Sequence, residues 1–153
     1  MISTDAVADE EELYRRIKNW DGYYKIENGR CRLSSQAFYE KQRRISVNRT
    51  HLCDNDPQRV QEEETDAVLS FLAEHVRVVI QGKKEDKTIV DSVVDVEPKP
   101  TLDNPAHAEI FAVPDYATNS TFKRLCEMLA RLYDVGKAQL LIAPPELREE
   151  VKE

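Results

Sequence analysis

Glycine is scarce in this chain, and cysteine is both scarce and widely spaced. The 153 residues include four glycines and three cysteines. A phosphate-binding loop of the dinucleotide or Walker type needs closely spaced glycines, so neither loop is present. An odd number of cysteines with no close pair is typical of free thiols in a reducing compartment. The sequence therefore excludes a disulfide scaffold and argues against the common glycine-loop nucleotide enzymes.

Long apolar runs are also absent. No run approaches the roughly 20 residues that cross a bilayer, and the first residues lack the basic and apolar regions of a secretory signal. Hydrophobic residues make up 41% and charged residues 33% of the chain, which is more charge than the usual ~25%. We expect a cytoplasmic protein with no membrane contact. A disordered tail is expected over residues 1–9 and a single globular domain over residues 10–153.

Charge is distributed unevenly along the chain. The net charge of −7 argues against general nucleic-acid binding, which needs clustered Lys and Arg. Residues 13–51 are nevertheless basic, with tyrosine, tryptophan and phenylalanine interleaved. This third of the chain either forms solvated faces around an aromatic core or presents a surface for an anionic ligand or partner. Its basic residues are Arg15, Arg16, Lys18, Lys25, Arg30, Arg32, Lys41, Arg43, Arg44 and Arg49.

The hydrophobic pattern predicts helices at three places. A short helix is expected over residues 10–20, with a strand over 13–17 as the alternative reading of the same apolar residues. Three early glutamates and one apolar face predict a second helix over 62–75. The third helix, over 120–134, has the clearest apolar stripe and ends before Gly136, where a left-handed residue belongs.

Alternating or β-branched segments predict the strands. The Asn-Gly turn at residues 28–29 predicts a hairpin between two short strands. Further strands are predicted by runs rich in β-branched residues. The predicted strands span residues 23–26, 31–33, 76–80, 88–96, 108–113 and 138–143. The order of elements predicts an α+β fold, a mixed or antiparallel sheet packed on one face by two main helices, 62–75 and 120–134.

The segment DNPAHAE at residues 103–109 is the most informative single stretch. Pro105 fixes its own φ and pushes Asn104 towards an extended conformation, so the chain direction there is set. The turn delivers His107 and Glu109 to the start of an apolar strand. His107 either bonds a nearby carbonyl and locks the turn or serves as a ligand-binding or catalytic group.

Arginines near the Ser-Ser pair at residues 34–35 suggest an anion site. Arg30 and Arg32 share a face if Cys31 lies in a strand, because side chains two apart point the same way. Guanidinium forks and hydroxyl donors suit phosphate or carboxylate. The predicted binding surface consists of Arg15, Arg30, Arg32 and Ser34, with His107 nearby.

The sequence gives little support for a nucleophilic active site or for a metal site. Ser34 with His107 and an acid would need a nucleophile exposed on a sharp turn, and no Gly-x-Ser-x-Gly is present. Cys126 falls on the apolar stripe of its helix, which makes it a core residue. His51 and Cys53 supply donors for zinc but lack a second spaced pair. We expect no metal and no cofactor.

Three islands of sequence resemble a scattered group of small bacterial proteins. The islands are LYRRI at residues 13–17, SSQAF at 34–38 with ISV at 45–47, and NPAHA at 104–108. The resemblance implies a bacterial cytoplasmic protein and supplies no reaction. It marks Arg15, Ser34, Ser35, Phe38 and His107.

A second resemblance is to ADP-ribosyltransferase-like enzymes. These use an early Arg or His, a Ser-containing strand and a late Glu around the dinucleotide and the developing oxocarbenium ion. Arg15 (or Arg16), Ser34 and Glu109 fall in that order. The chain departs from the pattern because it has no Ser-Thr-Ser, and His107 stands where a Glu-x-Glu would begin. The catalytic candidates are therefore Arg15, Ser34, His107 and Glu109.

Together these features favour an accessory or interaction protein over an enzyme. We expect a protein partner, with an anionic small ligand as a further partner. The alternatives are an ADP-ribosyltransferase-like enzyme or toxin, and a nucleotide- or RNA-binding module built on the basic first third.

Overall fold

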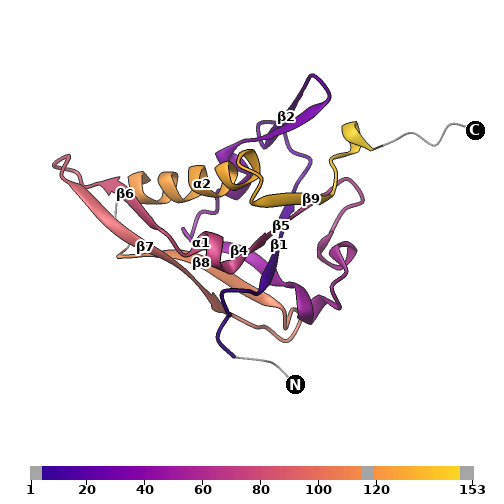
Figure 1. Cartoon of the computed structure of the whole chain (residues 1–153), viewed down its shortest axis with the longest axis horizontal. Helices are drawn as coiled ribbons and strands as arrows, with labels where there is room; N and C mark the ends of the chain where they lie inside the picture. The colour runs from indigo at the N-terminus through magenta and orange to yellow at the C-terminus, as the bar shows by residue number, and fades with distance from the viewer. Residues whose placement is uncertain (1–4, 115–118, 149–153) are drawn as a thin grey trace, which may run out of the picture.

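One curled antiparallel sheet and one long helix form most of the protein (Figure 1). The computed structural model describes residues 5–114 and 119–148. Seven strands pair in the order β6-β7-β8-β4-β1-β5-β9, and every neighbouring pair is antiparallel. The strands are β1 (Glu12–Ile17), β4 (Ile45–Arg49), β5 (Ala67–Leu72), β6 (Val79–Lys83), β7 (Ile89–Pro98), β8 (His107–Val113) and β9 (Ala138–Ile142).

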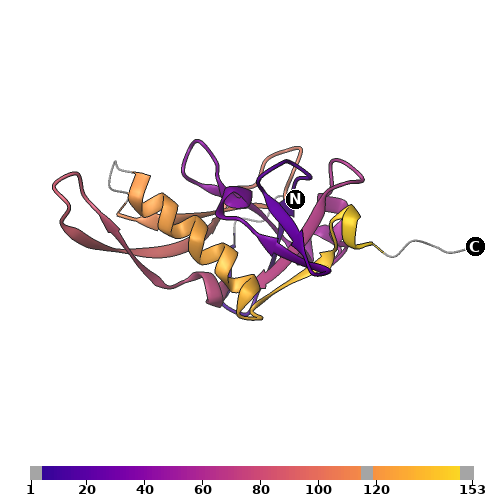
Figure 2. The same cartoon turned by 90° about the horizontal axis from the view of Figure 1, so that it is seen from above.

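The helix α2 (Asn119–Asp134) lies across one face of this sheet, alongside the projecting β6–β7 hairpin (Figure 2). A separate hairpin pairs β2 (Tyr24–Glu27) with β3 (Arg30–Leu33). Single turns of helix connect other elements, among them η1 (Ser35–Phe38) and α1 (Ala73–Val76). No helix in the described ranges is both long and apolar enough to cross a membrane.

The predicted fold class is wrong, because the expected second helix over 62–75 is mostly a strand. That stretch contains β5 and the one-turn helix α1. Every residue from Ala67 to Phe71 is buried, because β5 lies inside the sheet between β1 and β9. A strand that is buried on both faces reads as a continuous apolar run, which periodicity cannot separate from a helix. The protein is β-rich, with one main helix among the described residues.

The helix expected over 10–20 is also wrong, and the alternative strand is correct. Leu13 and Ile17 belong to the core beneath α2, whereas Tyr14 belongs to a second apolar cluster. This separation follows from the alternation of side chains across a strand. The aromatic and aliphatic residues that resembled one face of a helix are divided between two faces of a sheet.

Several local predictions are confirmed. Asn28 and Gly29 join β2 to β3 with positive φ values of 52° and 74°, as a tight hairpin turn requires. The helix α2 covers the predicted range, and Gly136 follows it with φ of 80°. β7, β8 and β9 lie close to their predicted bounds.

Part of the segment expected to form a tail lies within the described residues. Val7 is only 3% exposed and belongs to the main core. Its carbonyl accepts a bond of 2.6 Å from Arg77 Nη2, and the carbonyl of Asp5 accepts one of 2.7 Å from Arg49 Nη1. Residues 5–9 therefore pack against the domain, while residues 1–4 of the expected tail fall outside the described part.

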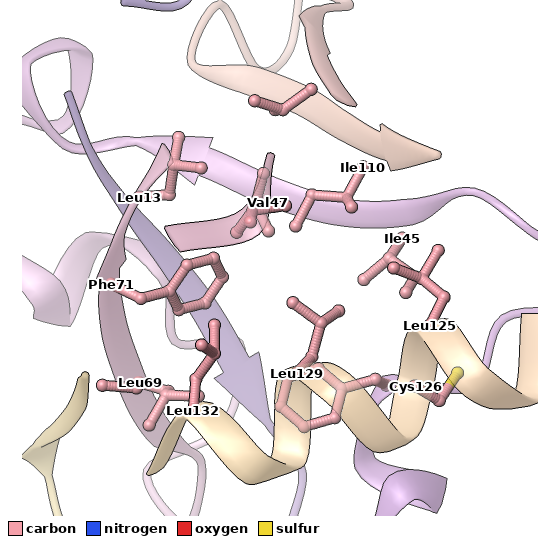
Figure 3. Packing of buried hydrophobic residues seen from close by; sticks show 14 of the residues in the cluster. Leu13, Ile45, Val47, Leu69, Phe71, Ile110, Leu125, Cys126, Leu129 and Leu132 are labelled. Atoms are coloured by element: carbon pink, nitrogen blue, oxygen red, sulfur yellow. The ribbon is translucent and has the colours of Figure 1, made fainter. Parts of the chain in front are cut away.

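The main core lies between α2 and the sheet (Figure 3). The helix contributes Leu125, Cys126, Leu129 and Leu132, all buried as the apolar stripe predicted. The same core contains side chains from all seven strands of the sheet, including Leu13, Ile45, Val47, Leu69, Phe71 and Ile110.

The contact between α2 and the edge strand β6 depends on a glycine. A Cβ built at Gly82 would lie within 3.0 Å of the Cα and N atoms of Thr121, and still closer to its hydroxyl oxygen. Two of these atoms are backbone, so the helix itself would have to move. We expect Gly82→Ala to lower the free energy of unfolding by about 1–3 kcal/mol through overpacking. Chemical denaturation measures this directly.

The matched control for this prediction is Gln81→Ala. Gln81 is exposed, so its substitution should change the free energy of unfolding by less than about 0.5 kcal/mol. Equal midpoints for the two variants would contradict the close packing of α2 on β6.

Candidate functional site

The predicted site residues lie in separate places. Arg15 and His107 line one polar pocket. Arg30 and Arg32 lie on β3, both exposed on the face opposite the buried Cys31, as their spacing predicted. These two arginines border a different hollow, and Ser34 caps the helical turn η1. The structure therefore brings Arg15 to His107 but not to Arg30 and Arg32.

A split in the sheet creates the polar pocket. β1 pairs with β4 through only two residue pairs, Leu13↔Arg49 and Tyr14↔Asn48, whereas it pairs with β5 along its whole length. From Arg15 onward the ladder between β1 and β4 is therefore missing. Backbone groups left inside such a gap need other partners.

The side chain of Arg15 closes the split. Its Nη1 donates to Glu40 Oε2 at 2.8 Å and to the carbonyl of Ser46, on β4, at 2.9 Å. Its Nη2 donates to the carbonyl of Ala37, in η1, at 2.8 Å. The guanidinium thus bonds backbone groups on both β4 and η1. It also lies 5.8 Å from the ring centroid of Phe38, within the range of a cation–π contact.

Burial gives this arginine a structural role. Burial lowers the pKa of Arg15, while the charge and hydrogen bond of Glu40 raise it, and the balance lies below its ordinary value. Glu40 also accepts bonds from the backbone N–H and the hydroxyl of Ser46. A guanidinium with this many internal partners is a poor candidate for holding a substrate phosphate.

The other transferase-like candidates are similarly engaged. Ser34 Oγ accepts the backbone N–H of Gln36 at 3.1 Å, which is the bond of a helix cap. Glu109 Oε1 accepts from Arg44 Nε at 2.6 Å. Arg15, Ser34 and Glu109 thus each hold a structural contact, and the geometry gives no support to a transferase site made from them.

His107 lies at one end of a chain of polar and charged side chains on the sheet face away from the buried Ala108 and Ile110. Its Nε2 lies 3.2 Å from Glu109 Oε2, and Arg44 links Glu109 to Glu97. The Arg44 guanidinium lies 4.4 Å from the ring centroid of Phe111. Burial raises the pKa of Glu109, but hydrogen bonds and charge from Arg44 and His107 bring it below its usual value. The contact with Glu109 positions the imidazole at the pocket wall.

The pocket itself has a volume of about 300 Å³. Asn48 lies opposite His107 in the β4–β8 ladder, and its Oδ1 accepts from Asn104 Nδ2 at 2.8 Å. Sequence reasoning missed Asn48, because strand pairing between distant segments cannot be read from spacing. The pocket is lined by Arg15, Arg16, Lys18, Tyr23, Tyr39, Glu40, Ser46, Asn48, Glu62, Asn104 and His107.

The cysteines offer no reactive thiolate. Cys31, Cys53 and Cys126 are free and buried. Burial raises the pKa of Cys31 to about 11 and that of Cys126 to about 12, and it also raises the pKa of Cys53. The thiol form therefore dominates at neutral pH. In the described ranges no three His, Cys, Asp or Glu side chains gather as metal ligands. The geometry supports binding rather than nucleophilic catalysis.

A second candidate surface is the free edge of β6. Val94 N–H donates to the carbonyl of Val78 at 2.9 Å, and Lys84 N–H donates to that of Thr88 at 3.0 Å. In an antiparallel ladder, backbone groups point alternately to either side. The N–H and C=O groups of residues 79, 81 and 83 therefore point away from β7.

One of these outward groups has a partner. Lys83 N–H donates to Ser120 Oγ, at the start of α2, at 2.9 Å. The backbone groups of Val79 and Gln81 have no partner within the described part of the chain. The edge thus leaves two consecutive outward positions available for pairing.

A groove of about 590 Å³ is lined by residues of this edge and of α2. Met128 and Ile89 give it apolar surface. Lys83, Arg124 and Arg131 give it three positive charges against the single carboxylate of Glu127, in a chain with a net charge of −7. The complete lining is Val79, Ile80, Gln81, Gly82, Lys83, Ile89, Arg124, Glu127, Met128 and Arg131.

Comparisons with protein-family models, with curated proteins and with solved structures find no match to this chain.

The structural role of Arg15 can be measured. Removing one partner of a buried ion pair leaves the other charge uncompensated, so Arg15→Ala should cost about 3–5 kcal/mol of unfolding free energy. Arg32→Ala removes an arginine whose side chain is 62% exposed and should cost less than about 1 kcal/mol. Similar losses for the two variants would show that Arg15 does not hold the split closed.

The Glu109 carboxylate should make stability depend on pH. Its pKa is lowered in the folded protein, so its stabilisation is complete above the unfolded pKa of ~4.3 and is lost as pH falls through the folded value. We expect wild type to exceed Glu109→Gln in unfolding free energy near neutral pH. This difference should shrink on acidification below about pH 4.

Glu85→Gln, an exposed substitution on the β6–β7 connection, is the control for the Glu109 experiment. It should show little difference from wild type at any pH. A Glu109→Gln difference that stays constant from neutral to acid pH would contradict the charged contact with Arg44.

Proposed function

We propose that this protein is an interaction module that binds an extended segment of a partner protein as an added strand on β6. The observation that carries the proposal is the pair of outward-facing backbone positions at Val79 and Gln81, beside a groove walled by α2. An added strand gains main-chain hydrogen bonds from such an edge, and pockets for its alternate side chains give specificity. The buried free thiols support placing the protein in a reducing cytoplasm.

Most of the β6 edge lacks protection against pairing, although Lys83 and the start of α2 protect one end. Sheet edges are commonly blocked by proline, by a bulge or by a covering loop. β6 contains no proline, and its register with β7 is continuous over five residue pairs. Only Lys83 has its outward N–H covered, by Ser120. The rest of the edge is accessible from the groove.

The two sides of the edge have different chemistry. On the α2 side stand Arg124 and Arg131. On the opposite face Val79 lies beside Val93, and Val93 lies beside Val113, in a row across three strands. These valines are 60%, 55% and 51% exposed. An added strand with acidic side chains on one face and apolar side chains on the other matches both surfaces.

The same charges disfavour a second copy as the occupant. Antiparallel pairing of two β6 edges needs a two-fold axis perpendicular to the sheet. Such an axis would place the α2 helices of both copies on the same face of the joined sheet. Arg124 and Arg131 of one copy would then approach those of the other, and like charges across an interface oppose association. We therefore assign the edge to an acidic extended segment of a different protein.

A synthetic peptide of about eight residues that alternates valine and glutamate is a suitable probe. We expect it to bind wild type and to slow amide hydrogen exchange at Val79 and Gln81, the two positions that would gain partners. A peptide of the same length with lysine for glutamate should bind at least about tenfold more weakly, since its charges oppose the groove. Titration calorimetry and exchange measured by NMR give both readouts.

Two substitutions at one position isolate the backbone contribution. Gln81→Pro removes only an N–H that points away from β7, so the β6–β7 ladder should persist while docking is lost. Gln81→Thr keeps the N–H and should keep binding. If Gln81→Pro binds the acidic peptide as wild type does, strand addition at β6 is wrong. A dimer of the unliganded protein that Gln81→Pro dissociates would instead identify a second copy as the occupant.

A further inference from the structure

The polar pocket at the split is bordered by aromatic side chains that contact the core on one side: Tyr23 packs against it, and Tyr39 lies edge-on to Phe122. Tyr23 and Tyr39 line it, and Tyr39 is 56% exposed. Trp20 adjoins Tyr23 with ring centroids 5.5 Å apart and is 57% exposed. Large exposed aromatic side chains gathered beside a pocket indicate a binding surface, because packing alone would bury them.

Cationic groups stand among these rings. Lys18 Nζ lies 4.3 Å from the centroid of the Trp20 ring, and no carboxylate pairs with it within the described part of the chain. Arg16 is paired with Glu62, whose side chain is 69% exposed. Such a surface pair is worth little and can exchange for a ligand anion. Arg16 also lies 3.7 Å from Asp66, which keeps the guanidinium at the pocket wall.

The floor of the pocket is already neutral. Arg15 and Glu40 compensate each other beneath it. Glu62 balances Arg16, so the surplus positive charge facing a ligand comes from Lys18. His107, which contacts Glu109, lines the same pocket. A single phosphate is the anion that such a surplus can accept, with lysine and arginine as its donors.

Two amide side chains add hydrogen-bonding capacity. Asn104 uses one N–H on Asn48 Oδ1 and accepts the backbone N–H of Ala106 on its own oxygen. The Asn48 NH₂ group and the second N–H of Asn104 have no partner within residues 5–114 and 119–148. Adjacent amides that both donate and accept suit the polar edge of a heteroaromatic ring.

We propose that this pocket binds a free mononucleotide. Its base stacks on the exposed aromatic side chains, its polar edge meets the asparagine amides, and its phosphate lies at Lys18 and Arg16. Base–aromatic stacking tolerates different bases. The site therefore distinguishes mononucleotides from other anions more strongly than it distinguishes one base from another. The volume of about 300 Å³ lies at the small end of ligand sites, which fits one nucleotide. A long nucleic acid is disfavoured by the net charge of −7.

This site is independent of strand addition at β6. The pocket and the groove share no lining residue, so either can be lost without the other. Binding of nucleotide by Gln81→Pro with unchanged affinity would show that independence experimentally.

The single tryptophan makes the experiment direct. AMP, GMP, CMP and UMP are titrated into the full chain, with Trp20 fluorescence and calorimetry as readouts. At least one should saturate with a dissociation constant below about 1 mM, an ordinary small-ligand affinity. Adenosine, ribose 5-phosphate and inorganic phosphate serve as fragments, and each should bind at least about fivefold more weakly because it lacks stacking or charge. A short single-stranded RNA tests for a longer ligand.

Substitutions assign the two halves of the ligand. Lys18→Gln should weaken mononucleotide binding at least about fivefold and reduce its dependence on salt. Tyr39→Ala should weaken it by a similar factor, whereas Tyr39→Phe, which keeps the ring, should not. Lys87→Gln, at the remote tip of the β6–β7 hairpin, is the control for loss of positive charge. Thermal unfolding of each variant confirms that the fold is retained.

Three results would overturn the proposal. One is the absence of saturable binding for all four mononucleotides. A second is inorganic phosphate binding as tightly as the best of them, which would make the pocket a bare anion site. The third is tighter binding of the RNA than of any mononucleotide, which would assign the surface to a polynucleotide.

Discussion

The buried ion pair between Arg15 and Glu40 is the interaction on which the centre of the molecule depends. The sheet separates between β1 and β4 after two residue pairs, and the guanidinium replaces the missing ladder with bonds to two backbone carbonyls and a carboxylate. The partly buried carboxylate of Glu40 compensates the charge of this cation, which would otherwise be costly to bury. Glu40 in turn fixes the start of β4 through Ser46. The same contacts that hold the two halves of the sheet together form the floor of the polar pocket.

The pocket and the groove follow from two different weaknesses in one sheet. The pocket lies where two inner strands stop pairing, and the groove lies where the last strand has no outer neighbour. In each place backbone or side-chain polar groups are left without their usual partners, and such groups seek others. The protein thus combines a rigid core under α2 with two local gaps in pairing, and both proposals of binding rest on those gaps.

The sequence predicted correctly those elements that depend on neighbouring residues alone. The Asn28–Gly29 turn, the long helix and its end at Gly136 were all readable from turn chemistry and periodicity. The helix expected over 62–75 failed because a strand buried on both faces carries the same apolar run. The sequence predicted the residues of the candidate site only in part. Arg15 could be singled out, but its contact with Glu40 and the approach of Asn48 to His107 arise from pairing between distant segments.

The hydrogen bond from Lys83 to Ser120 Oγ gives the free edge a definite end. An exposed strand of unlimited length is a template on which further copies can stack, and this is how ordered aggregates grow. Here the first turn of α2 occupies the last outward donor, so an approaching strand meets a helix after two open positions. Sheet growth by addition of copies along β6 is therefore interrupted by the molecule's own helix, so the edge proposed for docking is not an open template for a fibril.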